Sequence, residues 1–189
     1  MPKVIGLAGT MGSGKAVVKD YLMKKYNCYY VSLSSIIRAE FERRKTGFSR
    51  KTLQDQGNEM RKKYGNGIFA KLSISYLPRD KELIIVDGIR NPGEIEYLKK
   101  EFGNKFFMIG IDAPQKIRFE RIVKRARPSD PKTWEDFVVL DERDQGINEP
   151  AHGQQTKACL DLADFLLSTE GSEQEIETKL NEISSKIMG

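Results

Sequence analysis

The chain has 189 residues, 39% of them hydrophobic and 31% charged, and a formal net charge of +5 at pH 7. This length suits a single domain over residues 1–189 with a sizeable core, and the positive charge suits anionic partners such as nucleotides. No apolar run approaches the roughly 20 residues that span a bilayer, and the first residues lack the layout of a signal peptide. We therefore expect a cytoplasmic protein with no membrane partner, and the single His152 excludes a histidine metal cluster.

Apolar runs typical of strands alternate with helical patterns along the chain. In chain order, strands are predicted at 3–8, 28–33, 82–88, 105–112 and 164–169. Helical patterns lie at 15–26, from a cap at Ser34 or Ser35 onward, and at 50–65, 67–77, 92–102, 114–127, 130–144 and 171–188. This alternation predicts an α/β fold with a five-stranded parallel sheet that carries helices on both faces.

A glycine-rich loop joins the first predicted strand to the first predicted helix. It matches the pattern G-x-x-x-x-G-K-[ST] through Gly9, Gly14 and Lys15. Glycines let the main chain wrap around a phosphate, and the N–H groups at the start of the helix favour an anion. We therefore expect ATP at this loop and the turn that follows it, at Gly9, Gly12, Ser13, Gly14, Lys15, Ala16 and Val17.

Ala16 stands where the pattern has a hydroxyl that binds Mg²⁺. Magnesium keeps several waters and takes few protein ligands, so the loss of one ligand need not abolish binding. Two interpretations stay open: either water replaces the hydroxyl and activity persists, or the site is inactive.

The segment 38–80 is too long for a simple crossover between two strands. We expect it to form a helical lobe above the carboxyl ends of the strands, where α/β proteins bind ligands. Arg38 is expected to reach this space, because the planar guanidinium suits a phosphate. Arg50 and Arg61 are candidates to add charge from the lobe, or are simply solvated.

An acidic residue ends the buried apolar strand predicted at 82–88. Asp87 is placed to hold a water of the Mg²⁺ shell or to accept a proton from the acceptor. Arg90 follows three residues later and is expected to face the same space.

The helix predicted at 114–127 is rich in arginine. Arg118, Arg121 and Arg125 recur at a spacing that places them on one face, where positive charge would offset that of a transferring phosphoryl group. A nucleic-acid patch and a solvated basic face are the alternatives. Arg143, in the helix predicted at 130–144, is expected to face the same cleft.

Three short segments resemble motifs of the P-loop nucleoside monophosphate kinase superfamily. DGIR is similar to the D-G-x-P-R segment of adenylate kinases, which implies that Arg90 binds the acceptor phosphate. SLSSIIR resembles the segment that ends in a second acceptor-binding arginine, here Arg38. ERIVKR resembles the entrance to the lid, which implies that Arg121 and Arg125 close over the transferring group.

Other segments widen this resemblance. IGLAGTMGSGK, IDAPQKIRFERI and ADFLLSTEGS are also similar to dephospho-CoA kinases and to archaeal adenylate-kinase-related proteins. The resemblance implies a three-layer P-loop kinase fold with a helical acceptor-binding lobe at 38–80 and a short lid at 127–150. It also implies that the loop after the last strand contacts the donor adenine, through Thr169, Glu170 and Gly171.

Residues and resemblance together predict an ATP-dependent kinase that uses Mg²⁺ and acts on a small phosphate-bearing acceptor. A nucleoside or deoxynucleoside monophosphate is the first choice of acceptor, with Arg38, Arg61 and Arg90 binding it. Lys15, Asp87, Arg121 and Arg125 are the expected catalytic residues, and Asp87 is expected to hold the metal through water.

The alternatives to this enzyme are a dephospho-CoA kinase-like enzyme and a low-turnover ATP-binding switch protein. An RNA-associated ATPase ranks last, because no aromatic side chains for base stacking lie between the arginines. Nucleic acid is therefore not expected as a partner, and we expect a monomer or a homodimer.

Overall fold

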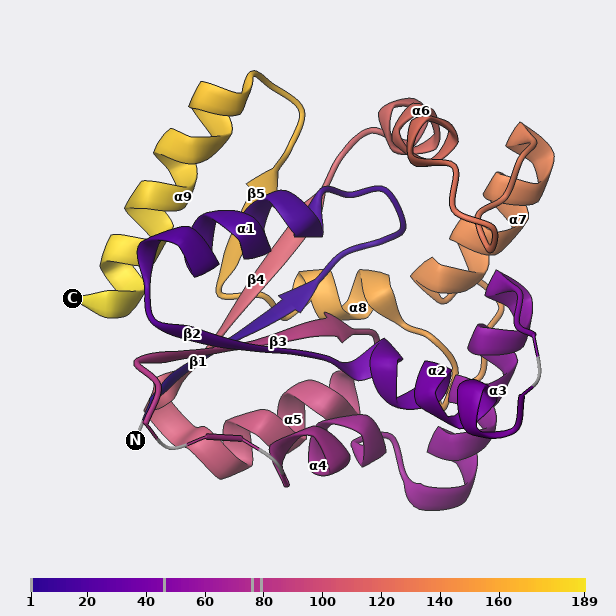
Figure 1. The fold of residues 1–189 in the computed structure, drawn as a ribbon, viewed down its shortest axis with the longest axis horizontal. Helices are drawn as coiled ribbons and strands as arrows, with labels where there is room; N and C mark the ends of the chain where they lie inside the picture. The colour runs from indigo at the N-terminus through magenta and orange to yellow at the C-terminus, as the bar shows by residue number, and fades with distance from the viewer. Residues whose placement is uncertain (1, 46, 76, 79) are drawn as a thin grey trace.

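The computed structural model describes residues 2–45, 47–75, 77–78 and 80–189 (Figure 1). Five strands form one parallel sheet in the order β2-β3-β1-β4-β5. The strands are β1 (Lys3–Ala8), β2 (Cys28–Ser32), β3 (Leu83–Ile89), β4 (Phe106–Asp112) and β5 (Phe165–Ser168). The α-helices are α1 (Lys15–Lys25), α2 (Leu33–Arg43), α3 (Arg50–Tyr64), α4 (Ile68–Ile74), α5 (Pro92–Phe102), α6 (Gln115–Arg125), α7 (Trp134–Gln145), α8 (Thr156–Asp161) and α9 (Glu173–Met188), and a 3-10 helix spans Gly103–Lys105.

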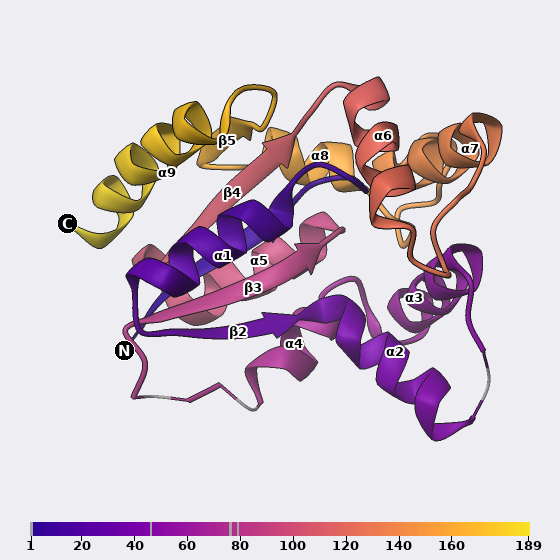
Figure 2. The same cartoon turned by 45° about the horizontal axis from the view of Figure 1, so that its top comes forward.

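Helices cover both faces of the sheet, as the alternation of elements predicts (Figure 2). Successive strand residues point to opposite faces, so Val4 and Ile5 enter different cores. Val4 packs in the core covered by α2, α4, α5 and α8. Ile5 packs in the core covered by α1 and α9. The predicted three-layer α/β architecture is thereby confirmed.

A third, smaller cluster joins α6 to α7 beyond the carboxyl ends of the strands. Met11, Ile122 and Phe137 form its buried part, with Phe119 and Trp134 packed against them. Together with α2 and α3, these two helices surround the end of the sheet from which the loop after β1 emerges (Figure 1). Among the described residues, no helix is both long and apolar enough to cross a membrane.

The start of α2 differs from the prediction. The helix begins at Leu33, so neither Ser34 nor Ser35 is its cap. The strand passes directly into the helix, and the hydroxyl of Ser35 instead donates to the carbonyl oxygen of Ser32, at 2.6 Å.

Two other differences concern the bounds of helices, and a third is a short helix that was not predicted. α7 begins at Trp134 rather than at 130, because the Thr133 hydroxyl caps it by accepting from the amide of Asp136 at 3.2 Å. α4 ends at Ile74 rather than at 77. The helix α8 was not predicted, because its six residues are too few for a periodic pattern.

Candidate active site

The loop between β1 and α1 has the backbone of a phosphate cradle. Gly12 and Gly14 have positive φ angles of 78° and 92°. A Cβ atom on Gly14 would lie 2.9 Å from Oγ1 of Thr169, so the close approach of the loop after β5 requires glycine here. The same Thr169 hydroxyl donates to the carbonyl oxygen of Ser13 at 2.8 Å, which fixes the shape of the loop.

Lys15 lies folded onto this loop. Its ammonium donates to the carbonyl oxygen of Thr10 at 2.9 Å and to that of Gly9. Burial lowers the pKa of Lys15 from 10.5 to about 8, although the charge of Asp87 acts in the opposite direction. The Lys15 ammonium is therefore desolvated and hydrogen bonded to neutral carbonyl groups. An anion would interact with it more strongly than these carbonyl groups do.

Ala16 and Val17 follow in the first turn of α1. Ala16 lines the cleft next to the loop and supplies no oxygen to it. Val17 is 43% exposed and does not line that cleft.

Asp87 lies at the carboxyl end of β3 and faces the same cleft. The hydroxyl of Tyr30 donates to its Oδ2 atom at 2.8 Å. Burial, together with the nearby carboxylate, raises the pKa of Tyr30, so the phenol stays protonated and can donate. Oδ1 of Asp87 is buried and has no hydrogen-bond partner among the residues that the structure describes.

One cleft of about 380 Å³ brings most of the predicted site together. Its walls include Lys15, Asp87 and six arginines, which come from α2, from α3, from the residue after β3, and from α6 and the turn that follows it. These arginines are Arg38, Arg50, Arg90, Arg121, Arg125 and Arg127. The sheet edge therefore collects cations that the sequence distributes over about ninety residues.

The arginines of α6 hold different partners. Arg121 donates from Nη1 to Oγ1 of Thr169 at 2.8 Å and from Nη2 to its carbonyl oxygen at 2.7 Å, so it joins α6 to the loop after β5. Arg125 is exposed and binds both carboxylate oxygens of Asp130, at 2.6 and 2.7 Å. Gly171 lies further along the loop after β5, outside the walls of the cleft.

Two arginines lie elsewhere than expected. Arg118 is only 4% exposed and binds the buried carboxylate of Asp141, because α6 packs against α7 at this point. Arg143 binds Asp55 at 2.6 Å and Glu149 at 2.9 Å and does not line the cleft. Neither guanidinium faces the cleft with Arg121 and Arg125.

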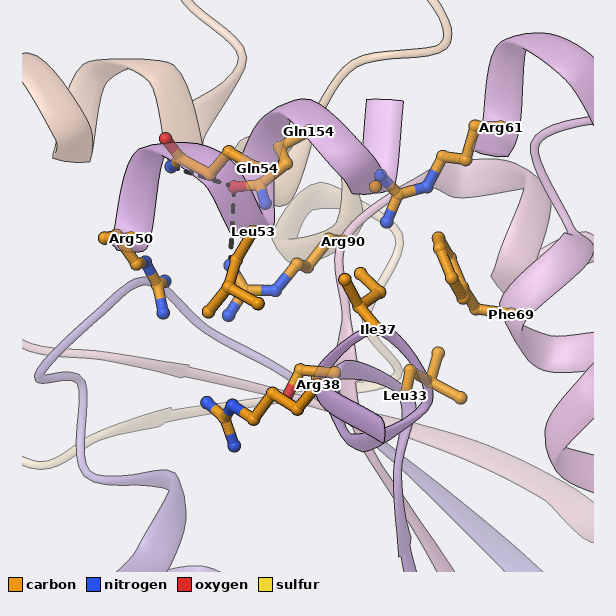
Figure 3. Close-up of a pocket in the computed structure, with 13 residues that line it drawn as sticks. Leu33, Ile37, Arg38, Arg50, Leu53, Gln54, Arg61, Phe69, Arg90 and Gln154 are labelled. Atoms are coloured by element: carbon orange, nitrogen blue, oxygen red, sulfur yellow. Dashed lines mark hydrogen bonds between the residues drawn. The ribbon is translucent and has the colours of Figure 1, made fainter. Parts of the chain in front are cut away.

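A small pocket of about 20 Å³ adjoins the cleft beneath the helical segment (Figure 3). Apolar side chains of α2, α3 and α4 line it together with the amides of Gln54 and Gln154; the apolar residues are Leu33, Ile37, Leu53 and Phe69. Gln54 donates to Oε1 of Gln154 at 3.3 Å.

Arg61 lies at the far end of this pocket. Its side chain is buried and donates from Nε and Nη2 to Oε1 of Glu94, at 3.0 and 2.8 Å. Nη1 is buried without a hydrogen-bond partner among the described residues. Arg61 is thus anchored by α5 and keeps one donor group free at the pocket.

Asp144, a fully buried carboxylate on α7, is not among the site residues predicted from the sequence. One oxygen accepts from Arg90, and the other accepts from the amide of Met11 in the phosphate loop at 3.2 Å. The positive charges around it, that of Arg90 above all, lower the pKa of Asp144 against the effect of burial. A signal was present in the sequence, because Phe137, Asp141 and Asp144 share one face of the helix.

A phosphate cradle after the first strand of a parallel sheet with this strand order defines the P-loop kinase fold. A Thermus thermophilus protein has a similar structure, with a TM-score of 0.63 and 16% identity over 100% of this chain and 99% of that chain. The structure of a shikimate kinase from Acinetobacter baumannii in complex with shikimate has a TM-score of 0.56 and 15% identity, over 98% of this chain and 94% of that chain. At these identities the likeness concerns the fold.

Sequence relatives give the narrower assignment. A family model described as an AAA domain matches residues 5–144. A UPF0200 protein of Pyrococcus furiosus is 32% identical over 190 residues, which cover 97% of each chain. One of Methanocaldococcus jannaschii is 30% identical over 188 residues, which cover 98% of this chain and 90% of the relative. The chain therefore belongs to the UPF0200 family and, through residues 5–144, to the AAA-domain family.

Proposed function

We propose that the protein is an ATP-dependent phosphotransferase whose acceptor is a small molecule that itself carries a phosphate. A nucleoside or deoxynucleoside monophosphate is the first choice. The observation that supports this proposal is that the cleft contains cations beyond those of the phosphate loop, namely Arg38 and Arg90. The loop and Lys15 suffice for the donor phosphates, whereas Arg38 and Arg90 add charge on the side of the helical segment 38–80.

The donor side of the site consists of the phosphate loop and α6. The N–H groups between Gly12 and Lys15 bind the donor phosphates, and the Lys15 ammonium leaves the loop carbonyls to pair with them. Arg121 and Arg125 line the cleft near this loop and offset the charge that develops on the transferring group.

The acceptor side lies toward the small pocket. Arg38 and Arg90 bind the acceptor phosphate, and Arg61 contributes its free N–H groups beside the apolar side chains of the pocket. The pocket volume of about 20 Å³ holds little more than a water molecule, so we expect the helical segment to move when an acceptor enters. Closure then excludes water and suppresses hydrolysis.

The residues of the cleft fit a Mg²⁺ ion that keeps most of its water shell. The unpartnered Oδ1 of Asp87 is a suitable acceptor for a shell water, whereas Ala16 supplies no ligand. When bound, the ion would neutralise charge on the donor phosphates. Asp87, fixed by Tyr30, would hold it through water or take a proton from the acceptor.

Ala16 favours a second candidate, an ATP-binding switch protein with little turnover. A site without the hydroxyl ligand can still bind a nucleotide through main-chain N–H groups, because those contacts do not depend on the side chain at this position. A dephospho-CoA kinase-like activity is a third candidate on the same fold.

A panel of acceptors separates these candidates. The protein is incubated with ATP, Mg²⁺ and AMP, CMP, dCMP, dTMP or dephospho-CoA, and ADP release is followed. Acceptor-dependent ADP release supports the kinase and identifies its acceptor, with Lys15→Met as the inactive control. ATP binding with no effect of any acceptor supports the switch protein and contradicts the kinase.

A further inference from the structure

Arg50, the first residue of α3, places a guanidinium in the wall of the cleft. Its side chain is 14% exposed. Nε and Nη2 are buried without a hydrogen-bond partner among the residues that the structure describes. Oδ2 of Asp144 lies 3.6 Å from Nη2, which is beyond hydrogen-bond reach. Buried N–H donors without partners raise the free energy of the ligand-free protein. An anion that accepts hydrogen bonds from them therefore stabilises the protein when it binds.

Arg50 does not stand alone in this wall. Figure 3 shows the guanidinium groups of Arg38, Arg50 and Arg90 turned to the same side of the pocket, with Arg61 and Phe69 on the opposite side. All three of the grouped arginines line both the cleft and the small pocket. They come from α2, α3 and the residue after β3, so three separate elements supply one cluster.

The charge of this cluster is only partly compensated. Asp144 pairs with Arg90 and lies 3.6 Å from Arg50, whereas Asp87 is the carboxylate that acts on Arg38. The three guanidinium groups therefore meet two carboxylates, and Lys15 adds one more positive charge to the same cleft. The surplus of two positive charges equals the charge of a phosphomonoester dianion. Burial and the charge of Arg90 lower the pKa of Arg50 to about 10, as expected for a desolvated cation beside another cation.

We propose that Arg50 is a binding residue for the acceptor phosphate and that it completes, with Arg38 and Arg90, a site selective for a phosphomonoester dianion. Asp144 is the positioning residue of this site: it holds Arg90 through Nη1 and leaves the N–H groups of Arg50 free. This inference rests on the proposed function and narrows its acceptor to molecules with a terminal phosphate group.

A structural role for Arg50 predicts a different response to mutation. If Arg50 served mainly to neutralise Asp144, its removal would lower the stability of the protein. Asp144 retains Arg90 and the amide of Met11, however, so the loss of Arg50 removes an unsatisfied buried cation instead. Arg50→Met should therefore leave the melting temperature of the ligand-free protein unchanged or raise it.

The test compares Arg50→Met and Arg50→Lys with Arg143→Met. Arg143 is the matched control, because its side chain is similarly buried, at 22% exposed against 14% for Arg50, but it pairs with Asp55 and Glu149 outside the cleft. With the acceptor that the panel identifies, Arg50→Met should raise the acceptor KM at least about tenfold and change the ATP KM less than about twofold. Arg50→Lys, which keeps the charge without the planar fork, should fall between. Arg143→Met should lower the melting temperature and leave both KM values unchanged.

A binding measurement makes the test independent of turnover. In the presence of saturating ADP, inorganic phosphate at pH 8 should raise the melting temperature of the wild type and of Arg143→Met, but not that of Arg50→Met. Dimethyl phosphate, a monoanion, should have no such effect on any of them. An acceptor KM unchanged in Arg50→Met, or an equal response of all variants to inorganic phosphate, overturns the inference.

The two proposals fail separately. If no acceptor stimulates ADP release by the wild type, the proposed function is wrong, and the response to inorganic phosphate still decides whether Arg50 binds an anion. If an acceptor is active and Arg50→Met handles it normally, the kinase stands and the role of Arg50 is refuted. If Arg50→Met does not fold, the same measurements on Arg50→Lys still test the role of Arg50.

Discussion

Raising the pH above 8 should weaken the binding of a nucleoside triphosphate, because Lys15 then loses its charge. In the ligand-free protein, burial lowers the pKa of this ammonium from 10.5 to about 8. A phosphate beside it favours the charged form and returns the pKa toward its ordinary value. The difference between 10.5 and about 8 corresponds to about 3 kcal/mol of coupling between protonation of Lys15 and phosphate binding, at 1.36 kcal/mol per pKa unit.

The assay is titration calorimetry with a non-hydrolysable ATP analogue. At pH 8 the ammonium of the free protein is half protonated, so binding should take up about half a proton, which appears as a dependence of the heat on the ionisation enthalpy of the buffer. Between pH 8 and 10 the Kd should rise about tenfold per pH unit. Lys15→Arg is the control, because a guanidinium stays charged at pH 8, where the proton uptake is measured.

The stability of the ligand-free protein should depend on pH in the opposite direction. The pKa of Lys15 is lower in the folded protein than in the unfolded chain, so between pH 8 and 10.5 the unfolded chain binds more protons. The contribution of Lys15 to the free energy of unfolding therefore rises with pH across this window and is least favourable below pH 8. A binding reaction with no proton uptake at pH 8, or with equal uptake in Lys15→Arg, would refute this account of Lys15.

Three further changes test other parts of the site. Ala16→Ser restores the hydroxyl at the metal position and should lower, several-fold, the Mg²⁺ concentration for half-maximal activity; an unchanged Mg²⁺ titration and rate would show that this position does not limit metal binding. Gly14→Ala places a Cβ atom at a φ of 92° and 2.9 Å from Thr169 Oγ1, so it should cost about 1–3 kcal/mol and abolish nucleotide binding, measured by urea unfolding and by calorimetry. Arg61→Met leaves the carboxylate of Glu94 buried without its cation and should cost about 3–5 kcal/mol of unfolding free energy, whereas the double change with Glu94→Gln should recover part of it.

Local patterns in the sequence predicted the strands and most of the helices of the protein. The structure confirms all five predicted strands. The central strands β1, β3 and β4 are mainly apolar because the inner strands of a parallel sheet are buried on both faces, whereas the edge strands β2 and β5 are only partly buried. α5 begins at Pro92 and ends at Phe102 as predicted, since Asn91 caps its start and Gly103 follows its end. The short helix α8 escaped prediction, because six residues carry no usable period.

The partners of the arginines did not follow from the same patterns. The spacing of Arg118, Arg121 and Arg125 places them on one helix face, yet the first is buried and the last is exposed. The cause is that α7 packs against the start of α6, where Asp141 takes the guanidinium of Arg118, and leaves the end of α6 to solvent. A helix pattern describes one element and contains no information about which neighbour covers which turn.

The sequence by itself therefore determined the strands, the phosphate loop and the position of Asp87, because each depends on residues that are neighbours along the chain. Only the tertiary structure decided which charges meet. Asp144 contacts Arg90, 54 residues away, and the amide of Met11, 133 residues away. Such contacts arise when the packing of helices brings distant turns together, and the free energy of a buried charge depends on that packing rather than on its place in the chain.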